Sequence, residues 1–214
     1  NEFEIFGQRL DANGTEVGAD DFVVKPFQVL LSDIHDGGGA PNPAAADANG
    51  PAFIAAGEPF SVIVTAIDAE GSATPNYGQE LIPETVTLTP TLVAPAVGDN
   101  PPVGNPTGFG AFAGGSATGG NFTWPEVGII QLTPSVGDGD YLGAGDVTGS
   151  VSGNVGRFVP HHFTTVLNVP TFATRCAAGS FSDIGETFAY SNAPVITLTA
   201  RAVAGEVTDN YTGS

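Results

Sequence analysis

Three carboxylates stand close together in a glycine-rich stretch and offer the oxygen ligands that calcium prefers. The stretch reads DGDYLGAGD and contains Asp138, Asp140 and Asp146. Calcium binds carboxylate and carbonyl oxygens in flexible loops, so a calcium site is one interpretation. The usual calcium-loop pattern fails, however, because Gly149 stands where a bidentate carboxylate is needed. The alternative is a turn in which each aspartate binds its own backbone.

A second acidic cluster stands at the start of a loop. Asp33, His35 and Asp36 lie within four residues, and Asp20 and Asp21 are near in sequence. A cation site and a polar turn are the two interpretations, and the polar turn is favoured because these residue types commonly bind their own backbone.

The adjacent pair His161 and His162 suggests zinc. Neighbouring residues on a strand point to opposite faces, so we do not expect the pair to share one ion. We expect one histidine to pack beside Arg157 at a joint between domains and the other to be exposed.

The repeated tyrosines have two possible roles. Tyr77 and Tyr211 each follow an asparagine, and could stack on sugars or close the end of a sandwich through the ring and hydroxyl. Their recurrence favours the structural role, and Trp124 is expected in the core.

The carboxylates of a glycosidase would have to come from residues such as Glu58, Glu84 and Glu126. No nucleophile elbow or phosphate loop is present, so we expect no enzyme.

The composition predicts an acidic, loop-rich β protein. The 214 residues include 30 glycines and 17 prolines, and the net charge is −18 with Lys25 as the one lysine. Such a charge repels nucleic acid and anionic membrane surfaces, so neither partner is expected. No apolar run is long enough to span a membrane. The lone Cys176 either pairs outside these residues or is a buried thiol. The start at Asn1 suggests a mature or excised piece.

The sequence contains an internal repeat. Residues 59–78 read PFSVIVTAIDAEGSATPNYG, and residues 193–213 read APVITLTARAVAGEVTDNYTG. Upstream, residues 22–27 (FVVKPF) resemble residues 158–163 (FVPHHF), 136 positions later. Tyr211 follows Tyr77 by 134 positions. This agreement predicts tandem copies of one domain, of which the second is incomplete.

The strand pattern predicts an all-β protein of tandem immunoglobulin-like β-sandwich domains. Val62, Val64 and Ala66 alternate in the clearest strand and should face the core. Further strands are expected at 22–34, 84–92, 109–124, 127–133 and 147–155. We predict an edge hairpin or the end of a preceding unit over 1–21, an immunoglobulin-like sandwich over 22–157 and the start of a second immunoglobulin-like repeat over 158–214.

An ordered set of short motifs resembles the C-terminal region of MshQ-like proteins, which belong to loci of the mannose-sensitive haemagglutinin type IV pilus. The motifs are FVVKPF (22–27), AGEPF (56–60), TPNYG (74–78), EVGII (126–130), DYLG (140–143), VGRF (155–158) and PHHF (160–163). The resemblance implies an exported, multidomain bacterial surface protein connected with pilus assembly or adhesion. It implies no catalytic site. The chain departs from the pattern at Val159 and near His161, so no role is transferred there.

These observations favour a structural or adhesive module outside the cell. Its expected partners are pilus or other surface proteins, including a neighbouring copy that exchanges strands. The alternative is a carbohydrate-binding module supported by calcium. Pro75, Tyr77, Arg157, Phe158, Cys176 and Tyr211 are expected to be structural.

Overall fold

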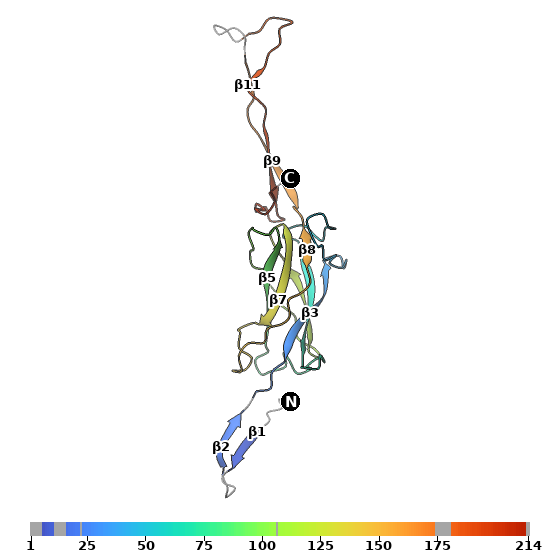
Figure 1. The fold of residues 1–214 in the computed structure, drawn as a ribbon, viewed down its shortest axis with the longest axis vertical. Helices are drawn as coiled ribbons and strands as arrows, with labels where there is room; N and C mark the ends of the chain where they lie inside the picture. Colours follow the sequence, from blue (N-terminus) through green and yellow to red (C-terminus); the bar gives the residue numbers. More distant parts are fainter. Residues whose placement is uncertain (1–5, 11–15, 22, 106, 174–180, 213–214) are drawn as a thin grey trace.

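The computed structural model describes the chain except residues 1–5, 11–15, 22, 106, 174–180 and 213–214. The described residues form strands and no helix, which confirms the all-β prediction (Figure 1). The strands are β1 (Phe6–Leu10), β2 (Glu16–Asp21), β3 (Gln28–Asp36), β4 (Phe60–Ile67), β5 (Val86–Ala94), β6 (Ser116–Phe122), β7 (Gly128–Val136), β8 (Val155–Phe158), β9 (His162–Leu167), β10 (Thr171–Phe172), β11 (Tyr190–Asn192) and β12 (Ile196–Arg201). With no helix in this part of the chain, none is present there to cross a membrane.

The centre of the molecule consists of two three-stranded antiparallel sheets. One has the order β3-β4-β6 and the other has the order β5-β7-β8. The two sheets share hydrophobic clusters, since Val29 and Val64 of the first sheet lie in one cluster with Val136 of the second. This arrangement is a β-sandwich, while the finer immunoglobulin-like assignment stays a prediction.

Strand β4 forms because its side chains alternate between two environments. Val62, Val64 and Ala66 are completely buried, as the alternation predicted. Ser61, Ile63 and Thr65, on the other face, are half-buried. The strand is therefore covered fully on one face and partly on the other.

Aromatic side chains fill one half of the core. Trp124 is fully buried, as expected, and its ring centroid lies 5.2 Å from that of Phe158. Phe158 also packs against Phe53 and Phe60, at centroid distances of 6.0 and 5.9 Å. The indole N–H of Trp124 donates to the carbonyl of Pro101 at 3.1 Å, which satisfies its polar group.

Three of the predicted strands differ in the structure. The strand expected at 109–124 is β6, which begins only at Ser116. The strand expected at 147–155 is instead β8, which begins at Val155, and Thr148 makes only an isolated bridge with Ser135. The strand expected at 22–34 begins only at Gln28, beyond the buried Pro26, which lacks an N–H to donate. Ladder pairing rather than local composition decides these boundaries.

Two-stranded hairpins extend from opposite ends of the sandwich (Figure 1). At one end β1 pairs with β2 in an antiparallel hairpin. At the other end β9 pairs with β12, and β10 with β11 continues the same arm. The molecule is consequently long and narrow.

Candidate functional site: the joint between sandwich and arm

The same turn is built twice in this chain. The N–H of Thr74 donates to the carbonyl of Ala66 at 2.9 Å, and 134 residues later the N–H of Thr208 donates to Ala200 at 3.1 Å. The turn glycines Gly71 and Gly205 both have positive φ, of 85° and 98°. Glycine adopts this conformation without strain, so the sequence repeat corresponds to a structural repeat at this turn.

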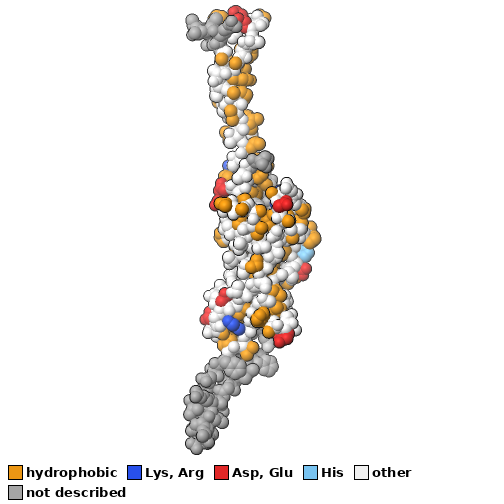
Figure 2. All heavy atoms as spheres, viewed as in Figure 1, with side chains coloured by type: hydrophobic (Ala, Val, Ile, Leu, Met, Phe, Trp, Pro, Cys, Tyr) orange, Lys and Arg blue, Asp and Glu red, His pale blue; other side chains and the backbone are white. Residues whose placement is uncertain are grey.

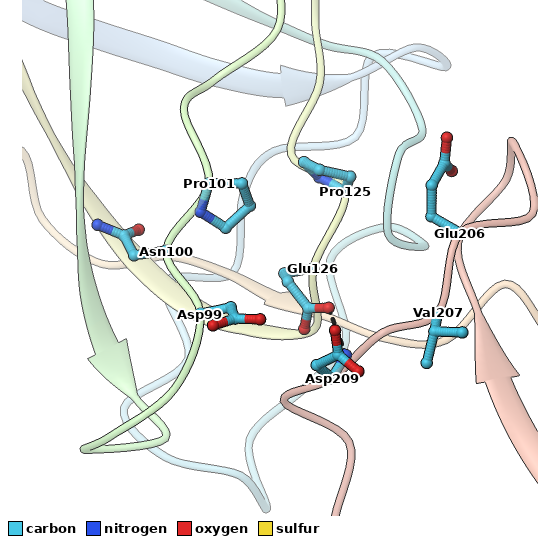
Figure 3. A pocket seen from close by; sticks show the side chains of 8 residues that line it. All are labelled: Asp99, Asn100, Pro101, Pro125, Glu126, Glu206, Val207 and Asp209. Atoms are coloured by element: carbon cyan, nitrogen blue, oxygen red, sulfur yellow. Dashed lines mark hydrogen bonds between the residues drawn. The ribbon is translucent and has the colours of Figure 1, made fainter.

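The second turn is fixed to the sandwich by Glu126. This residue is 4% exposed, and its carboxylate accepts hydrogen bonds from the backbone N–H groups of Asp209 and Asn210, the latter at 2.9 Å. It also accepts the N–H of Val127 at 3.1 Å. Figure 3 shows Glu126 and Asp209 facing each other. One carboxylate thus holds two segments that are about eighty residues apart in sequence.

A second contact lies beside the first. The side-chain amide of Asn210 accepts the N–H of Asp99 at 2.7 Å and donates to the carbonyl of Asp99 at 2.8 Å. Gly98 makes this approach possible, because a Cβ at that position would overlap the Oδ1 of Asn210. The Asp99 loop is therefore shaped to receive Asn210.

Apolar and backbone contacts complete the joint. Ala202 is fully buried and forms a small cluster with Ala56 and Val127. The N–H of Val203 donates to the carbonyl of Ala56 at 2.9 Å. The base of the arm is therefore attached to the sandwich by a carboxylate, an amide and packed methyl groups.

Burial sets the electrostatics of the joint. It raises the pKa of Glu126 above the usual range for glutamate, and the three N–H donors oppose this shift in part. The charge of Asp209 adds to the increase. The Glu126 carboxyl is consequently held in place by hydrogen bonds from three backbone N–H groups.

An acidic pocket of about 410 Å³ opens at the joint (Figure 3). Its lining includes the carboxylates of Asp99, Glu126, Glu206 and Asp209. Within the described ranges, no group of three or more histidine, cysteine, aspartate or glutamate residues is arranged to hold a metal ion. The Glu126 oxygens already accept backbone N–H groups, so the pocket is part of a structural joint.

Family models match nearly the whole chain. Residues 25–122 match the second domain of DUF6701, and residues 126–214 match the third. The chain carries two DUF6701 domains. No curated protein and no solved structure matches it.

The two DUF6701 domains share one sandwich. The second domain supplies β3 to β6, whereas β7 and β8 come from the third. Val64 from the second domain and Val136 and Tyr141 from the third belong to one buried cluster. The boundary at residues 122–126 therefore divides the second sheet, because β5 belongs to the second domain and its partner β7 to the third. Glu126 itself stands at the start of the third domain.

The aspartates of the glycine-rich loop bind the loop itself. Asp138 accepts the N–H of Asp140 at 3.0 Å, and Asp140 accepts the N–H of Gly145 at 2.7 Å. Asp146 accepts the hydroxyl of Thr148 at 2.9 Å. These contacts are the ones expected of a turn in which the aspartates bind their own loop. Calcium binding at this loop stays a prediction.

Lys25, at the start of the match to the second DUF6701 domain, contacts the same loop. Its ammonium donates to the carbonyls of Ala144 and Asp146, both at 2.9 Å. Carbonyl oxygens of this kind would complete a calcium shell, so the lysine occupies part of the place a cation would take. Lys25 and this loop are about 120 residues apart, so the sequence pattern could not predict their contact.

The cluster at Asp33 is also a polar turn. Asp36 accepts the N–H groups of Gly38 and Ala40, and the His35 ring nitrogen Nδ1 lies 2.9 Å from the carbonyl oxygen of Asp33. The side chains of Asp20 and Asp21 lie outside the described part, so their relation to this cluster stays a prediction.

The expectation for the histidine pair was wrong. Both histidines are exposed, and the Nδ1 atoms of His161 and His162 lie 3.0 Å apart. The alternation rule applies inside a strand, but His161 precedes β9. Arg157 is half-buried and donates to the carbonyl of Gly50 at 3.0 Å, and no described contact links it to a histidine.

The repeated tyrosines differ in their surroundings. Tyr77 is 1% exposed, stacks on Tyr141 at 5.8 Å and donates to the carbonyl of Thr85 at 3.3 Å. Tyr211 is 44% exposed and meets Phe163 edge-on at 5.4 Å. Tyr77 is thus too buried to stack on a sugar, and the structural role expected of the two tyrosines stays a prediction.

The remaining predicted residues are distributed through the fold. Pro75 is exposed in the turn before Tyr77, and Phe158 lies in the aromatic core. Cys176 lies outside the described residues. Sequence reasoning missed Glu126, Gly98 and Lys25 as structural residues, since the partners of each are distant in sequence.

Proposed function

We propose that this chain is a structural module of a bacterial surface appendage, of the type IV pilus-associated, MshQ-like kind that its motifs resemble. It would act outside the cell as a spacer, with pilus or other surface proteins as partners. The single observation that carries the proposal is the joint at Glu126, which attaches a long arm to the end of a sandwich.

A spacer must keep its length and direction under load. A flexible linker between domains would allow relative motion, which is the usual expectation for small interfaces. Here the carboxylate of Glu126 and the amide of Asn210 attach the second turn to two separate loops of the sandwich. Buried hydrogen bonds of this kind fix orientation as well as distance.

The repeated turn supports the same role. Tandem modules extend a protein by repeating one unit and one contact between neighbours. The recurrence of the Gly71 turn at Gly205 supports a chain built from such units. No observation favours a second function strongly enough to be proposed beside this one.

Immunogold electron microscopy of the source cells, with antibody against this chain, tests the proposal. We expect label along or at the ends of surface filaments. Antibody absorbed with the purified chain provides the control and should give no label. Label confined to the cell interior would overturn the proposal.

A further inference from the structure

Two imidazole rings face each other where the arm begins. The Nδ1 atoms of His161 and His162 lie 3.0 Å apart, the ring centroids lie 5.2 Å apart, and the rings are perpendicular. The nitrogens are closer together than the centroids by about two ring radii, so both nitrogens lie near the line that joins the ring centres. Each Nδ1 therefore points at the other ring.

The backbone explains why two neighbouring side chains can meet. His162 is the first residue of β9 and pairs with Arg201. The N–H of His161 donates to the carbonyl of Arg201 at 2.9 Å, so His161 is held beside the same residue without belonging to the strand. Pro160 precedes the pair and fixes its own φ, and the chain bends at His161. The alternation of a strand therefore begins only after the pair.

The two Nδ1 atoms remain available to a metal ion. Within the described residues each contacts only the other, and both side chains are exposed. In the neutral pair one Nδ1 donates its proton in a hydrogen bond and the other accepts it. When the donor ring holds its proton on Nε2 instead, two lone pairs face one small space. By contrast, the carboxylates of Glu126 and Asp138 already accept backbone N–H groups.

The spacing suits a planar metal ion better than a tetrahedral one. Imidazole nitrogen binds zinc at about 2.0–2.1 Å, so two nitrogens on a tetrahedral ion are about 3.3 Å apart. At the right angle of a square-planar ion with similar bonds they are about 2.9 Å apart. The observed 3.0 Å is closer to the second value. Copper(II) prefers this geometry, accepts imidazole and binds most strongly among the divalent ions of its row.

The charges around the pair are compatible with a bound cation. Arg201 is the basic residue beside His162, and its guanidinium donates to the Oγ1 of Thr164 at 3.0 Å and to the carbonyl of Gly205 at 2.8 Å. Its charge thus already faces two oxygen atoms. The net charge of the chain is −18, which raises the concentration of cations near its surface.

We propose that His161 and His162 form a site for copper(II), which binds through both Nδ1 atoms. Water completes the coordination plane, because two protein ligands are fewer than the three or four of a permanent metal centre. The site lies at the start of β9, so a bound ion would fix both rings at the base of the arm. The inference goes beyond the spacer function and does not depend on it.

Electron paramagnetic resonance of the purified chain with one equivalent of copper(II) sulfate tests the site. We expect a square-planar copper spectrum with splitting from two imidazole nitrogens. His161→Ala and His162→Ala should each retain one such nitrogen and weaken copper binding about a hundredfold, because a single ring loses the gain from the second. Isothermal titration calorimetry with glycine as the competing ligand measures the dissociation constants.

The third histidine of the chain provides a matched control. His35 lies in β3, and its Nδ1 is 2.9 Å from the carbonyl oxygen of Asp33. His35→Ala should therefore bind copper like the parent. Cys176→Ser should also bind like the parent, which tests the thiol as a ligand. Fluorescence of the buried Trp124 reports that the sandwich is folded in every variant.

Three outcomes would overturn the inference. The first is a parent chain that binds no copper or shows only one imidazole nitrogen. The second is equal copper binding by the parent and by the double variant His161→Ala/His162→Ala. The third is loss of binding in His35→Ala or Cys176→Ser, which would place the copper at a different residue. Magnesium, which prefers oxygen ligands, should give no binding heat at this site.

Discussion

Asn210 binds the backbone of Asp99 through both ends of its side-chain amide, at 2.7 and 2.8 Å. The amide thereby imitates one step of a β-ladder between two segments that are 111 residues apart. Its equivalent in the first copy of the turn, Asn76, is exposed. Both copies of the turn therefore contain the asparagine, but only Asn210 uses its side chain to bind the Asp99 loop.

Removal of this amide should loosen the arm without unfolding the sandwich. We expect Asn210→Ala to destabilise the joint locally by about 1–3 kcal/mol, because the backbone groups of Asp99 lose their partners. Amide hydrogen exchange at Asp99 and Asn210 measures the effect. Gly98→Ala should do the same by overlap with Asn210, while Asn76→Ala should change little. Equal effects of Asn76→Ala and Asn210→Ala would contradict the assignment.

The stability of the joint should fall as the pH rises through the titration of Glu126. Burial raises the pKa of this carboxyl in the folded state, so the folded protein holds the proton more tightly than the unfolded chain does. Unfolding free energy should therefore decrease with pH between the ordinary glutamate pKa and the raised value. Urea unfolding across this range measures the slope.

Glu126→Gln should flatten that slope, because the amide does not titrate. Glu84→Gln is the control at a different place in the fold, since the pKa of Glu84 is also raised, by burial and by Asp138 and Glu80. Each substitution should remove its own part of the pH dependence. An unchanged slope in Glu126→Gln would show that the joint carboxyl does not contribute.

The two repeated tyrosines should respond very differently to truncation. Tyr77 is buried in the core, so Tyr77→Ala should destabilise the sandwich by about 3–5 kcal/mol, as for other large aromatic residues. Tyr211→Ala should have a much smaller effect because Tyr211 is 44% exposed. Chemical denaturation measures the unfolding free energy of both variants. Similar losses of unfolding free energy would mean that Tyr211 is buried in solution.

Lys25 should weaken any binding of calcium to the Asp138 loop. Its ammonium donates to the carbonyls of Ala144 and Asp146, which a cation would otherwise use. We expect calcium to raise the melting temperature of Lys25→Met more than that of the parent, with magnesium as the control ion. A parent that gains as much as the variant would show that the lysine does not compete.

Strand periodicity predicted the fold class and the repeat but not the burial. Val64 and Leu198 hold equivalent positions with the same inward pattern, yet one is 0% and the other 63% exposed. Alternation identifies the face that needs a cover, whereas burial depends on the sheet opposite. That sheet is distant in sequence and leaves no trace in the local pattern.

The joint could not be predicted for a related reason. Glu126 is an isolated acidic residue before a strand, and its partners Asp209 and Asn210 lie in another part of the chain. The histidine pair failed because His161 lies just outside β9, where strand alternation no longer applies. Local rules therefore held within strands and failed at their ends.

The position of the family boundary inside the sandwich has a genetic consequence. A deletion that followed residues 122–126 would leave β5 without its sheet partners β7 and β8 and expose the core. By contrast, excision of 134 residues that began within β3 or β4 would join each strand to its equivalent in β9 or β12 and keep the register of the hairpin. Unequal recombination should therefore change the length of such a gene in whole periods, with breakpoints inside the equivalent hairpins.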